Sequence, residues 1–524
     1  MSFPLLTATA VLPAVGAIAT AAVPAKQRTA AKWLALLFSL ATLVLAAVVA
    51  VRFDPGGGRF QLTESHAWIK DFGVRYELGV DGIAVALIAL TALLIPFVIL
   101  AGWHDADPQE TGNTRWRPTQ GFFALILLVE AMVIISFEAT DVFVFYIFFE
   151  AMLIPMYFLI GGFGDRAGPH GEKEAATQRS YAAVKFLLYN LVGGLIMLAA
   201  VIGLYVVAGS FSLSEIAEAR ASGSLDMATN TERLLFLGFF FAFAVKAPLW
   251  PLHTWLPNAM GEATAPVAVL ITAVVDKVGT FAMLRFCLQL FPEASKWATP
   301  VILVLALISI VYGALVAVGQ RDIKRLVAYA SISHFGFIIM GIFAMTSQGQ
   351  SGATLYMVNH GISTAALMLV AGFLISRRGS RLIADYGGVQ KVAPVLAGTF
   401  LIGGLATLSL PGLAPFVSEF LVLVGTFTRY PVIGIIATFG IVLAALYTLV
   451  LYQRTMTGPV KPSTEGIADL RVRELAVVVP LIGVLIFLGV YPKPLTELVN
   501  PAVKHTLSDV HKKDPKPEVE AAHK

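Results

Sequence analysis

Long apolar runs recur along almost the whole of this 524-residue sequence. Each run is close to the roughly 20 residues that a helix needs to cross the hydrocarbon layer of a membrane. Backbone polar groups are costly in lipid unless a helix or a closed barrel pairs them, so such runs predict transmembrane helices. About fourteen spans are expected from windows of roughly 19 residues. They lie near residues 4–23, 32–51, 83–102, 119–138, 141–162, 180–208, 234–258, 266–289, 297–318, 325–345, 353–375, 396–427, 431–453 and 475–495.

Composition agrees with an all-α, polytopic membrane protein. The chain is 57% hydrophobic and 13% charged, and its mean hydropathy is +0.79. A single cysteine, Cys287, excludes a disulfide framework, an iron–sulfur cluster and a Cys-ligated zinc site within the chain. The net charge is only +4 and is dispersed over short loops, which argues against nucleic-acid binding. We therefore expect a lipid bilayer as the surroundings and no cofactor or metal in this chain.

Basic residues in short loops predict the orientation of the spans. They gather in alternate loops, which we assign to the cytoplasm, so that both termini are expected on the outer side. The first run lacks a leading basic region and is interpreted as a retained helix rather than a signal peptide. The last segment, 504–524, is rich in Lys, Glu, Pro and His and is expected to be a disordered tail. The basic loop residues are Lys26, Arg28, Lys32, Arg115, Arg117, Arg166, Lys173, Arg179, Arg321, Lys324, Arg325, Arg377, Arg378, Arg381, Lys391, Arg454, Lys461, Arg471 and Arg473.

Prolines interrupt two of the predicted spans. The seventh contains Pro248 after Lys246, and the twelfth contains Pro411 and Pro415. Proline removes a backbone donor, and the freed carbonyl is tolerated at membrane depth only inside protein or beside a hydrated cavity. The two breaks lie five spans apart, an odd number that reverses direction, so they predict two inverted five-helix repeats. The alternative is a pair of unrelated kinks. The predicted units are 1–118 (three helices), 119–289 (first repeat), 290–453 (second repeat), 454–503 (one helix) and 504–524 (tail).

Ionisable residues within the spans are the candidates for function, because charges in a bilayer are costly and rarely face lipid. Together they form a row of proton-binding groups. The row consists of Glu130, Glu150, Lys246, Lys277, His334, His360 and Glu419, with His253 at the first break.

Lysine suits proton transfer if its pKa is lowered from about 10.4 to near 7, which takes roughly 4–5 kcal/mol. Burial supplies part of this shift, whereas a carboxylate about 4 Å away opposes it by about 4 kcal/mol at an effective dielectric near 20. Moving the carboxylate could therefore carry the lysine across neutrality. Glu150 and Lys246 are the expected pair, and the expected order continues through Lys277, His334 and His360 to Glu419.

Each candidate has a simpler alternative. The lysines and carboxylates could form static buried ion pairs, and the histidines could be neutral groups that hydrogen-bond between helices. Glu130 could cap a helix contact, and Lys185 lies close enough to its helix end to reach the interface. Asp276 points about 100° away from Lys277 around the helix and could serve as a local counter-ion.

Several strings resemble the antiporter-like membrane subunits of respiratory complex I, the NADH:quinone oxidoreductase. They cover nearly the whole chain. They are FFEAMLIPMY at 148–157, KAPLWPLHTWLP at 246–257, SISH at 331–334, NHG at 359–361, LPG at 410–412 and FVSE at 416–419. The resemblance implies fourteen helices with two inverted half-channels. It also implies proton transfer by Glu150, Lys246, Lys277, His334 and His360, coupled to electron transfer elsewhere in the complex.

Three sister chains, L, M and N, share this plan. In the M branch the last residue of the row is a glutamate, as Glu419 is here, whereas L and N typically have lysine. The chain length also agrees, because L continues into a lateral helix and an extra span. The resemblance therefore implies a bacterial inner-membrane subunit that contacts the L and N chains.

One feature departs from the family pattern. The family usually has Asp, Ala, His after the proline, whereas this chain has Asn258, Ala259 and Met260. A proton-entry role for that loop is therefore in doubt, and His253 or Glu262 is the expected substitute. The rival functions are a stand-alone cation/proton antiporter component, a membrane subunit of a hydrogenase or formate-oxidising complex, and a structural scaffold. Genome neighbourhood discriminates the first two from complex I.

Overall fold

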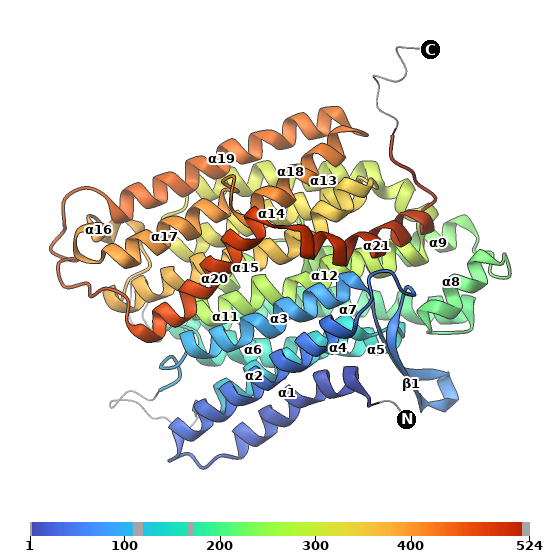
Figure 1. Ribbon diagram of the computed structural model, residues 1–524, viewed down its shortest axis with the longest axis horizontal. Helices are drawn as coiled ribbons and strands as arrows, with labels where there is room; N and C mark the ends of the chain where they lie inside the picture. Colours follow the sequence, from blue (N-terminus) through green and yellow to red (C-terminus); the bar gives the residue numbers. More distant parts are fainter. Residues whose placement is uncertain (1–2, 108–118, 166–171, 516–524) are drawn as a thin grey trace.

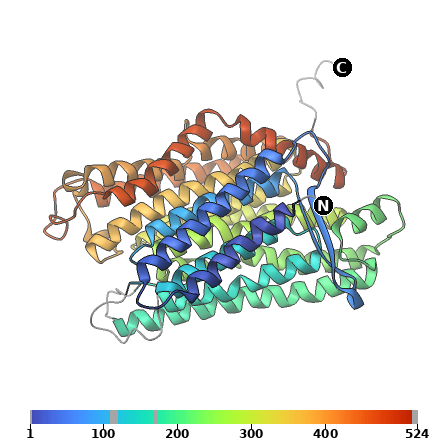
Figure 2. The same cartoon turned by 60° about the horizontal axis from the view of Figure 1, so that its bottom comes forward.

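The fold is an elongated bundle of helices that run roughly alongside one another (Figures 1 and 2). The structure is a computed structural model, and it describes residues 3–107, 119–165 and 172–515. Arg115, Arg117 and Arg166, and positions 516–524 of the expected tail, lie outside these residues. Figure 1 places the start of α1 (Leu5–Ala22) and the end of α21 (Lys493–Asp509) at the same end of the bundle.

Twelve helices of the described chain are long and apolar enough to cross a membrane, and they match twelve of the fourteen predicted spans. The other two predicted spans are the broken ones. The count of fourteen and the inverted repeats stay predictions. Beside α1 and α21, the helices outside the breaks and outside span eight are α2 (Arg28–Arg52), α3 (Gly82–Ala101), α4 (Thr119–Glu138), α5 (Val142–Ala151), α6 (Leu153–Phe163), α7 (Glu172–Ala208), α8 (Leu213–Ala221), α13 (Pro292–Val318), α14 (Ile323–Phe343), α15 (Ser347–Arg378), α16 (Val389–Val392), α19 (Pro431–Met456) and α20 (Val472–Val490).

Short polar side chains begin several of these helices. Asp81 accepts a hydrogen bond from the Ala84 amide at the start of α3. Asp141 caps α5, Asp322 caps α14 and Thr346 caps α15 in the same way. A side-chain oxygen at this position satisfies amides that have no partner inside the helix. These caps place the ends of the helices that carry Glu150, His334 and His360.

The first break separates α9 (Thr229–Lys246) from α10 (Leu256–Glu262). Pro248 has no amide hydrogen, and the Leu249 amide bonds back to the Ala244 carbonyl at 3.0 Å, five residues away. The carbonyl of Val245 instead accepts the indole N–H of Trp255 at 2.9 Å. The break is therefore satisfied within the protein, and it leaves Lys246 at the end of a helix.

The second break separates α17 (Pro394–Thr407) from α18 (Ala414–Phe427). Here the Leu410 amide bonds back to the Leu405 carbonyl at 3.0 Å, the same five-residue spacing as at the first break. The chain turns with Ser409 at φ +61° and Gly412 at φ +94°. A positive φ is costly for a residue with a side chain, so Ser409 is a strained position.

Span eight is buried from Pro266 to Leu288 and combines two helix types. It consists of α11 (Ala265–Val269), a π-helical segment η3 (Leu270–Val275), α12 (Asp276–Ala282) and a second π-helical segment η4 (Met283–Leu288). π-Helical turns are rare and are frequent at functional sites. Lys277 lies in the α-helical turn between them.

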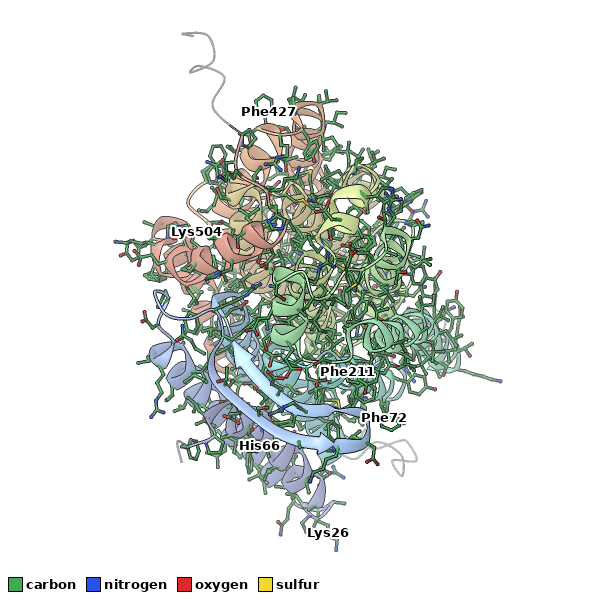
Figure 3. All side chains as sticks on the ribbon, turned by 90° about the vertical axis from the view of Figure 1, so that its right-hand side faces the viewer. Lys26, His66, Phe72, Phe211, Phe427 and Lys504 are labelled. Atoms are coloured by element: carbon green, nitrogen blue, oxygen red, sulfur yellow. The ribbon has the colours of Figure 1, made fainter. Side chains whose placement is uncertain are left out.

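A β-hairpin crosses the end of the bundle where α1 begins (Figure 3). Its strands are β1 (Gln61–Ile69) and β2 (Val74–Val80), joined through a 3-10 turn, η1 (Lys70–Phe72). Glu64 on β1 accepts the Leu6 amide at 2.9 Å and the Thr7 hydroxyl at 2.5 Å. A carboxylate here satisfies the free amides at the start of α1 and complements the helix dipole.

The expectation of a disordered segment from residue 504 is wrong for 504–509. Helix α21 continues to Asp509, because Val499, Val503 and Leu507 recur every four residues on one face and are buried. This face packs on the start of α3, where a Cβ on Gly82 would lie only 1.8 Å from the Leu498 carbonyl oxygen. Glycine is therefore needed at position 82.

Candidate functional site

The structure gathers the predicted row inside the bundle. Lys246 ends α9 and Lys277 lies in α12, and both are buried. The two helices meet at Gly279, where a Cβ would lie 2.9 Å from the Ala247 nitrogen. The row thus passes from the first break to span eight without an intervening element. The remaining positions are Glu130 in α4, Glu150 in α5, His253 in the first break, His334 in α14, His360 in α15 and Glu419 in α18.

Lys246 contacts the helix of Glu150 rather than its carboxylate. Its Nζ donates to the carbonyl of Phe149 at 2.6 Å and lies 3.6 Å from the centroid of the Phe149 ring. Among the described residues, no ion pair within 4.0 Å joins Lys246 to Glu150, so the expected contact pair is not formed. The two groups are still close enough to interact electrostatically.

Three carboxylates, in spans four, five and eight, have oxygens without a hydrogen-bonding partner in the described chain. Both oxygens of Glu130 and of Asp276 are buried and unpaired, and so is Oε1 of Glu150. Glu150 faces Gly194 on α7, where a Cβ would lie 2.0 Å from Oε1. Glycine therefore makes room for the Glu150 carboxylate.

Lys277 makes a direct contact with the second half of the row. Its Nζ lies 2.7 Å from Nδ1 of His360, and 4.1 Å from the centroid of the Phe335 ring. Nε2 of His360 lies 3.2 Å from the Thr364 hydroxyl. His360 is thus the first histidine after Lys277, whereas the expected order placed His334 first.

His334 and Glu419 are joined by a tyrosine. The Tyr356 hydroxyl lies 2.5 Å from Nδ1 of His334 and donates to Oε2 of Glu419 at 3.0 Å. The Ser409 hydroxyl also donates to Glu419. The ring centroids of His334 and His360 are 5.4 Å apart, so the two histidines are neighbours without a direct hydrogen bond. The contacts therefore run from Lys277 to His360, and from His334 through Tyr356 to Glu419.

Sequence reasoning missed Tyr356 and Ser409. Tyr356 precedes His360 by four residues on α15, and side chains four apart share a face of a helix. This spacing was the available signal. Ser409 could not be found in this way, because its place depends on the turn inside the second break.

His253 is buried between Tyr312 and Tyr329, whose ring centroids are 5.2 Å and 6.4 Å away. Both of its ring nitrogens lack a partner in the described chain. Glu262, the other expected substitute for proton entry, is paired with Arg381 at 2.7 Å. Asn258 accepts a hydrogen bond from Lys185 at 3.0 Å. These loop positions are therefore engaged in contacts of their own, and His253 is the one with free nitrogens.

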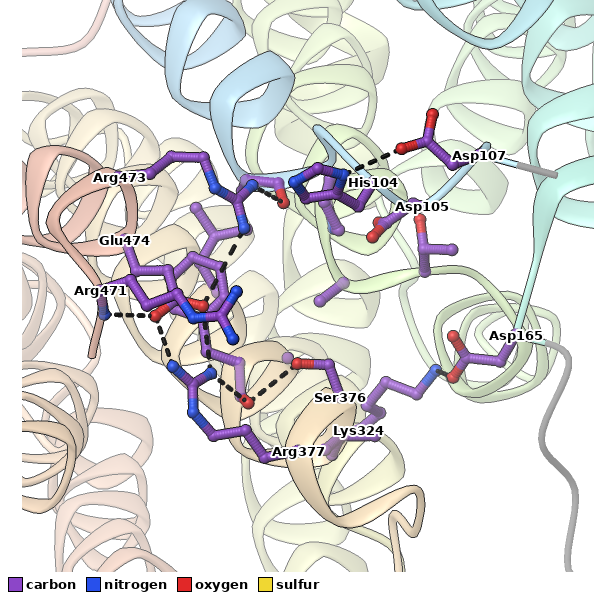
Figure 4. A pocket seen from close by; sticks show the side chains of 18 of the residues that line it. His104, Asp105, Asp107, Asp165, Lys324, Ser376, Arg377, Arg471, Arg473 and Glu474 are labelled. Atoms are coloured by element: carbon purple, nitrogen blue, oxygen red, sulfur yellow. Dashed lines mark hydrogen bonds and ion pairs between the residues drawn. The ribbon is translucent and has the colours of Figure 1, made fainter. Parts of the chain in front are cut away.

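A polar cavity of about 720 Å³ opens at the end of the bundle away from the hairpin (Figure 4). Thr264 and Pro266, at the start of span eight, and Gly372 and Ser376, on α15, line its wall. The cavity therefore touches both helices of the Lys277–His360 contact. Asp105 projects into it, and Arg377 and Glu474 form an ion pair of 2.5 Å on its wall.

Two carboxyls in this cavity differ in pKa. Burial and the nearby negative charge of Asp165 raise the pKa of Asp105 to about 7, against the opposing effect of Arg473, Thr264 and Lys324. Burial also acts on Asp107, but hydrogen bonds from Lys32 and His104 outweigh it and lower the pKa of Asp107. Of these two carboxyls, Asp105 is the one whose pKa lies near neutral pH.

The family model described as "NADH:quinone oxidoreductase/Mrp antiporter, TM" matches residues 139–444, more than half of the chain. The chain belongs to this family of membrane subunits. NADH-quinone oxidoreductase subunit M of Mycobacterium tuberculosis is 54% identical over 98% of this chain and 96% of its own length. Subunit M of Rhodobacter capsulatus is 38% identical over 93% and 92%.

A chain of the solved respiratory complex I from Thermus thermophilus matches with a TM-score of 0.84 and 30% identity, over 96% of this chain and 99% of that one. A chain of the Mrp complex from Dietzia sp. DQ12-45-1b has a TM-score of 0.80 but 20% identity, over 98% and 100%, and so shows the fold alone. Within the family the chain groups with subunit M. It is a proton-translocating membrane subunit of NADH:quinone oxidoreductase.

Proposed function

We propose that protons pass through this chain along the row of buried side chains described above. The observation that carries the proposal is the pair of contact chains, Lys277 to His360 and His334 through Tyr356 to Glu419. Each contact joins two groups that can both accept and release a proton, at hydrogen-bonding distance. A static packing role would not require titratable groups at each of these positions.

Lys246 begins the row in this proposal, with Glu150 as the carboxylate that sets its charge. The two are separate here, with Lys246 bonded to the Phe149 carbonyl. A lysine released from its carboxylate holds its proton less tightly. Movement of Glu150 relative to Lys246 would therefore pass a proton to Lys277. Water would bridge the unpaired carboxylates Glu130 and Asp276, because buried polar groups are otherwise left unsatisfied.

Proton supply is proposed from the cavity end, through Asp105 or through His253. We also propose that the chain carries no redox centre and that electron transfer takes place in other subunits. In the described residues, no group of three or more His, Cys, Asp or Glu side chains is placed to hold a metal ion. The domain boundaries and the inverted repeats remain part of the proposal.

We propose a bacterial inner membrane as the location, with both termini on the outer side. Basic residues in the loops after α1, α13 and α19 support this orientation. Because its relatives are named as complex I subunits, other membrane subunits are expected beside this chain. We propose that L and N flank it, with Glu150 towards one junction and Glu419 towards the other. Site-specific cross-linking in membranes would test this, and a position at the far tip of the arm would contradict it.

The central experiment is Lys277→Met. The variant complex should assemble but lose both NADH-driven proton pumping and most quinone reduction, because the two are coupled. Pumping is measured by quenching of a pH-sensitive dye in inverted membrane vesicles, with NADH oxidation recorded beside it. Wild-type pumping in an assembled Lys277→Met complex would remove Lys277 from the path.

A further inference from the structure

Arg285 is a buried cation that the row does not use. It lies in η4, eight residues after Lys277 on the same span, at 1% exposure. Eight residues correspond to about 12 Å along a helix. A guanidinium stays protonated at all physiological pH values. Span eight therefore carries a fixed positive charge between Lys277 and the end of the bundle that the hairpin covers.

The surroundings of Arg285 hold it in place. The central carbon of its guanidinium lies 4.8 Å from the ring centroids of both Phe281 and Phe60, and the guanidinium forms an ion pair with Asp81 at 3.0 Å. Phe60 belongs to the segment that leads into the hairpin. Its neighbour Arg59 pairs with Asp509 on α21 at 2.5 Å. Three separate parts of the chain thus close over this end of span eight.

The groups nearer to Lys277 offer a different exit. The hydrogen bond of Lys277 goes sideways to His360, on α15. Towards Arg285, the next polar side chain on the helix is Thr280, whose hydroxyl donates to the Lys277 carbonyl. Phe281 follows and packs edge-on against Phe137 at 5.1 Å. A proton on Lys277 can therefore pass to His360, to which Lys277 is hydrogen-bonded, whereas the route along span eight leads to the positive charge of Arg285.

We propose that Arg285 is an electrostatic barrier that prevents protons on Lys277 from leaking along span eight to the hairpin end, so that they leave through His360. A fixed arginine excludes protons and cations in other membrane pores by the same physics. Asp81 lowers the cost of burying the Arg285 guanidinium by acting as its counter-ion. The proposal rests on the proposed function, because it requires protons to reach Lys277.

The experiment compares variants in which the charge is kept or removed. Arg285→Lys and Asp81→Asn keep the cation, and asparagine still caps a helix. The double variant Arg285→Met/Asp81→Asn removes the cation with little change of volume and leaves no buried unpaired charge. The matched control is Arg220→Met/Glu232→Gln, which removes a partly buried pair of 3.4 Å between α8 and α9, outside the row.

The measurement is the decay of an imposed pH gradient in inverted vesicles that contain the assembled complex, without NADH. We expect faster decay in Arg285→Met/Asp81→Asn, by less than the roughly tenfold effect of a lone charge about 12 Å away at an effective dielectric near 20, because Asp81 cancels part of the field of Arg285. In Arg285→Lys, Asp81→Asn and the control, the pH gradient should decay as slowly as in wild type. Adding Lys277→Met to the leaking variant should restore tightness.

Two outcomes would overturn the barrier. If Arg285→Met/Asp81→Asn is as tight as wild type, the pair is a structural lock, and the Lys277→Met pumping assay still decides the proposed function on its own. If the leak persists after Lys277→Met is added, the leaking route does not pass through Lys277. Either result separates the failure of the barrier from the failure of the row.

Discussion

The two halves of the proposed row differ in the contacts that their side chains make. In the first half, Lys246 bonds to the Phe149 carbonyl rather than to the Glu150 carboxylate, and Glu130, Glu150 and Asp276 have oxygens that lack a partner in the described chain. In the second half, a hydrogen bond joins Lys277 to His360, and the hydroxyl of Tyr356 bridges His334 and Glu419. The first half therefore depends on charge and distance. The second depends on two hydrogen-bonded sets, Lys277 with His360 and His334 with Tyr356 and Glu419, which meet where the two histidine rings lie 5.4 Å apart.

The two breaks show the same contrast. Both use a five-residue backbone hydrogen bond to absorb the proline. At the first, the freed Val245 carbonyl is paired with the Trp255 indole, so the aromatic ring closes the gap and Lys246 is left facing α5. At the second, Ser409 is held at positive φ and its hydroxyl donates to Glu419. Similar breaks thus present a cation in one half and an anchored carboxyl in the other.

The largest expected effect is in the first half. Lys246→Ala should leave the complex assembled but reduce quinone reduction and pumping together, on the order of 100-fold, as expected when a group that binds and releases protons is removed. NADH oxidation and dye quenching in the same vesicles provide the measurement. Lys185→Ala, which removes a lysine bonded to Asn258 outside the row, is the control and should be milder. Normal pumping in Lys246→Ala would contradict the hypothesis that the charge of Lys246 controls proton transfer in this half.

Glu419→Gln tests the end of the second half. Glutamine keeps the volume but cannot release a proton, so pumping should fall about tenfold. Glu419→Lys should be less damaging, because lysine is titratable and can donate to the Tyr356 oxygen while that hydroxyl bonds to His334. The assay is again pumping with NADH oxidation recorded. Equal, wild-type pumping in Glu419→Gln would make Glu419 a structural residue, and the row would end before it.

Tyr356→Phe removes the bridge and little else. The hydroxyl contacts both His334 and Glu419, so its loss should slow pumping about fivefold, the rate equivalent of a hydrogen bond worth about 1 kcal/mol. Tyr447→Phe is the control, because its hydroxyl contacts the other nitrogen of His334 at 3.3 Å and lies outside the bridge. An equal effect of both variants would assign Tyr356 to the positioning of His334 alone.

The smallest expected effect concerns Asp105 and stability. Its pKa is raised to about 7 in the folded chain from the ordinary 3.8, so the folded state binds a proton that the unfolded state has lost. The stability that it contributes is present at low pH and is lost as the pH rises from about 4 to 7. The apparent melting temperature should therefore fall between pH 5 and pH 7.5 in wild type and in Asp105→Asn. The fall should be smaller in Asp105→Asn, by a few degrees. Helical circular dichroism on heating measures this, and parallel pH profiles would contradict the assignment.

Much of the fold could be predicted because a bilayer imposes one length and one solvent. Twelve helices match apolar runs of the expected length, and the breaks follow from Pro248 and Pro411. The hairpin and α21 could not be predicted in this way. Both lie at the end of the bundle, where Glu64 and Leu507 are placed by tertiary contacts rather than by the membrane.

The candidate site follows a similar division. The titratable residues of the row could be predicted, because ionisable residues within a bilayer usually have a function. This rule did not point to Tyr356, because a tyrosine carries no charge, and its place in the proposed row rests on its contacts with His334 and Glu419. The contact of Lys277 with His360 rather than with His334 could not be predicted for the same reason. It depends on how α14 and α15 pack, which no single helix specifies.

The solitary thiol has a practical consequence for the orientation of the chain. Cys287 is buried in span eight with no exposed surface, so an impermeant maleimide has no accessible target on the folded natural chain within its described residues. A cysteine introduced at Lys26 or at His66, which Figure 3 labels, would then be the single reactive point. Labelling of intact cells at one position and of inverted vesicles at the other would assign each end of the bundle to its compartment.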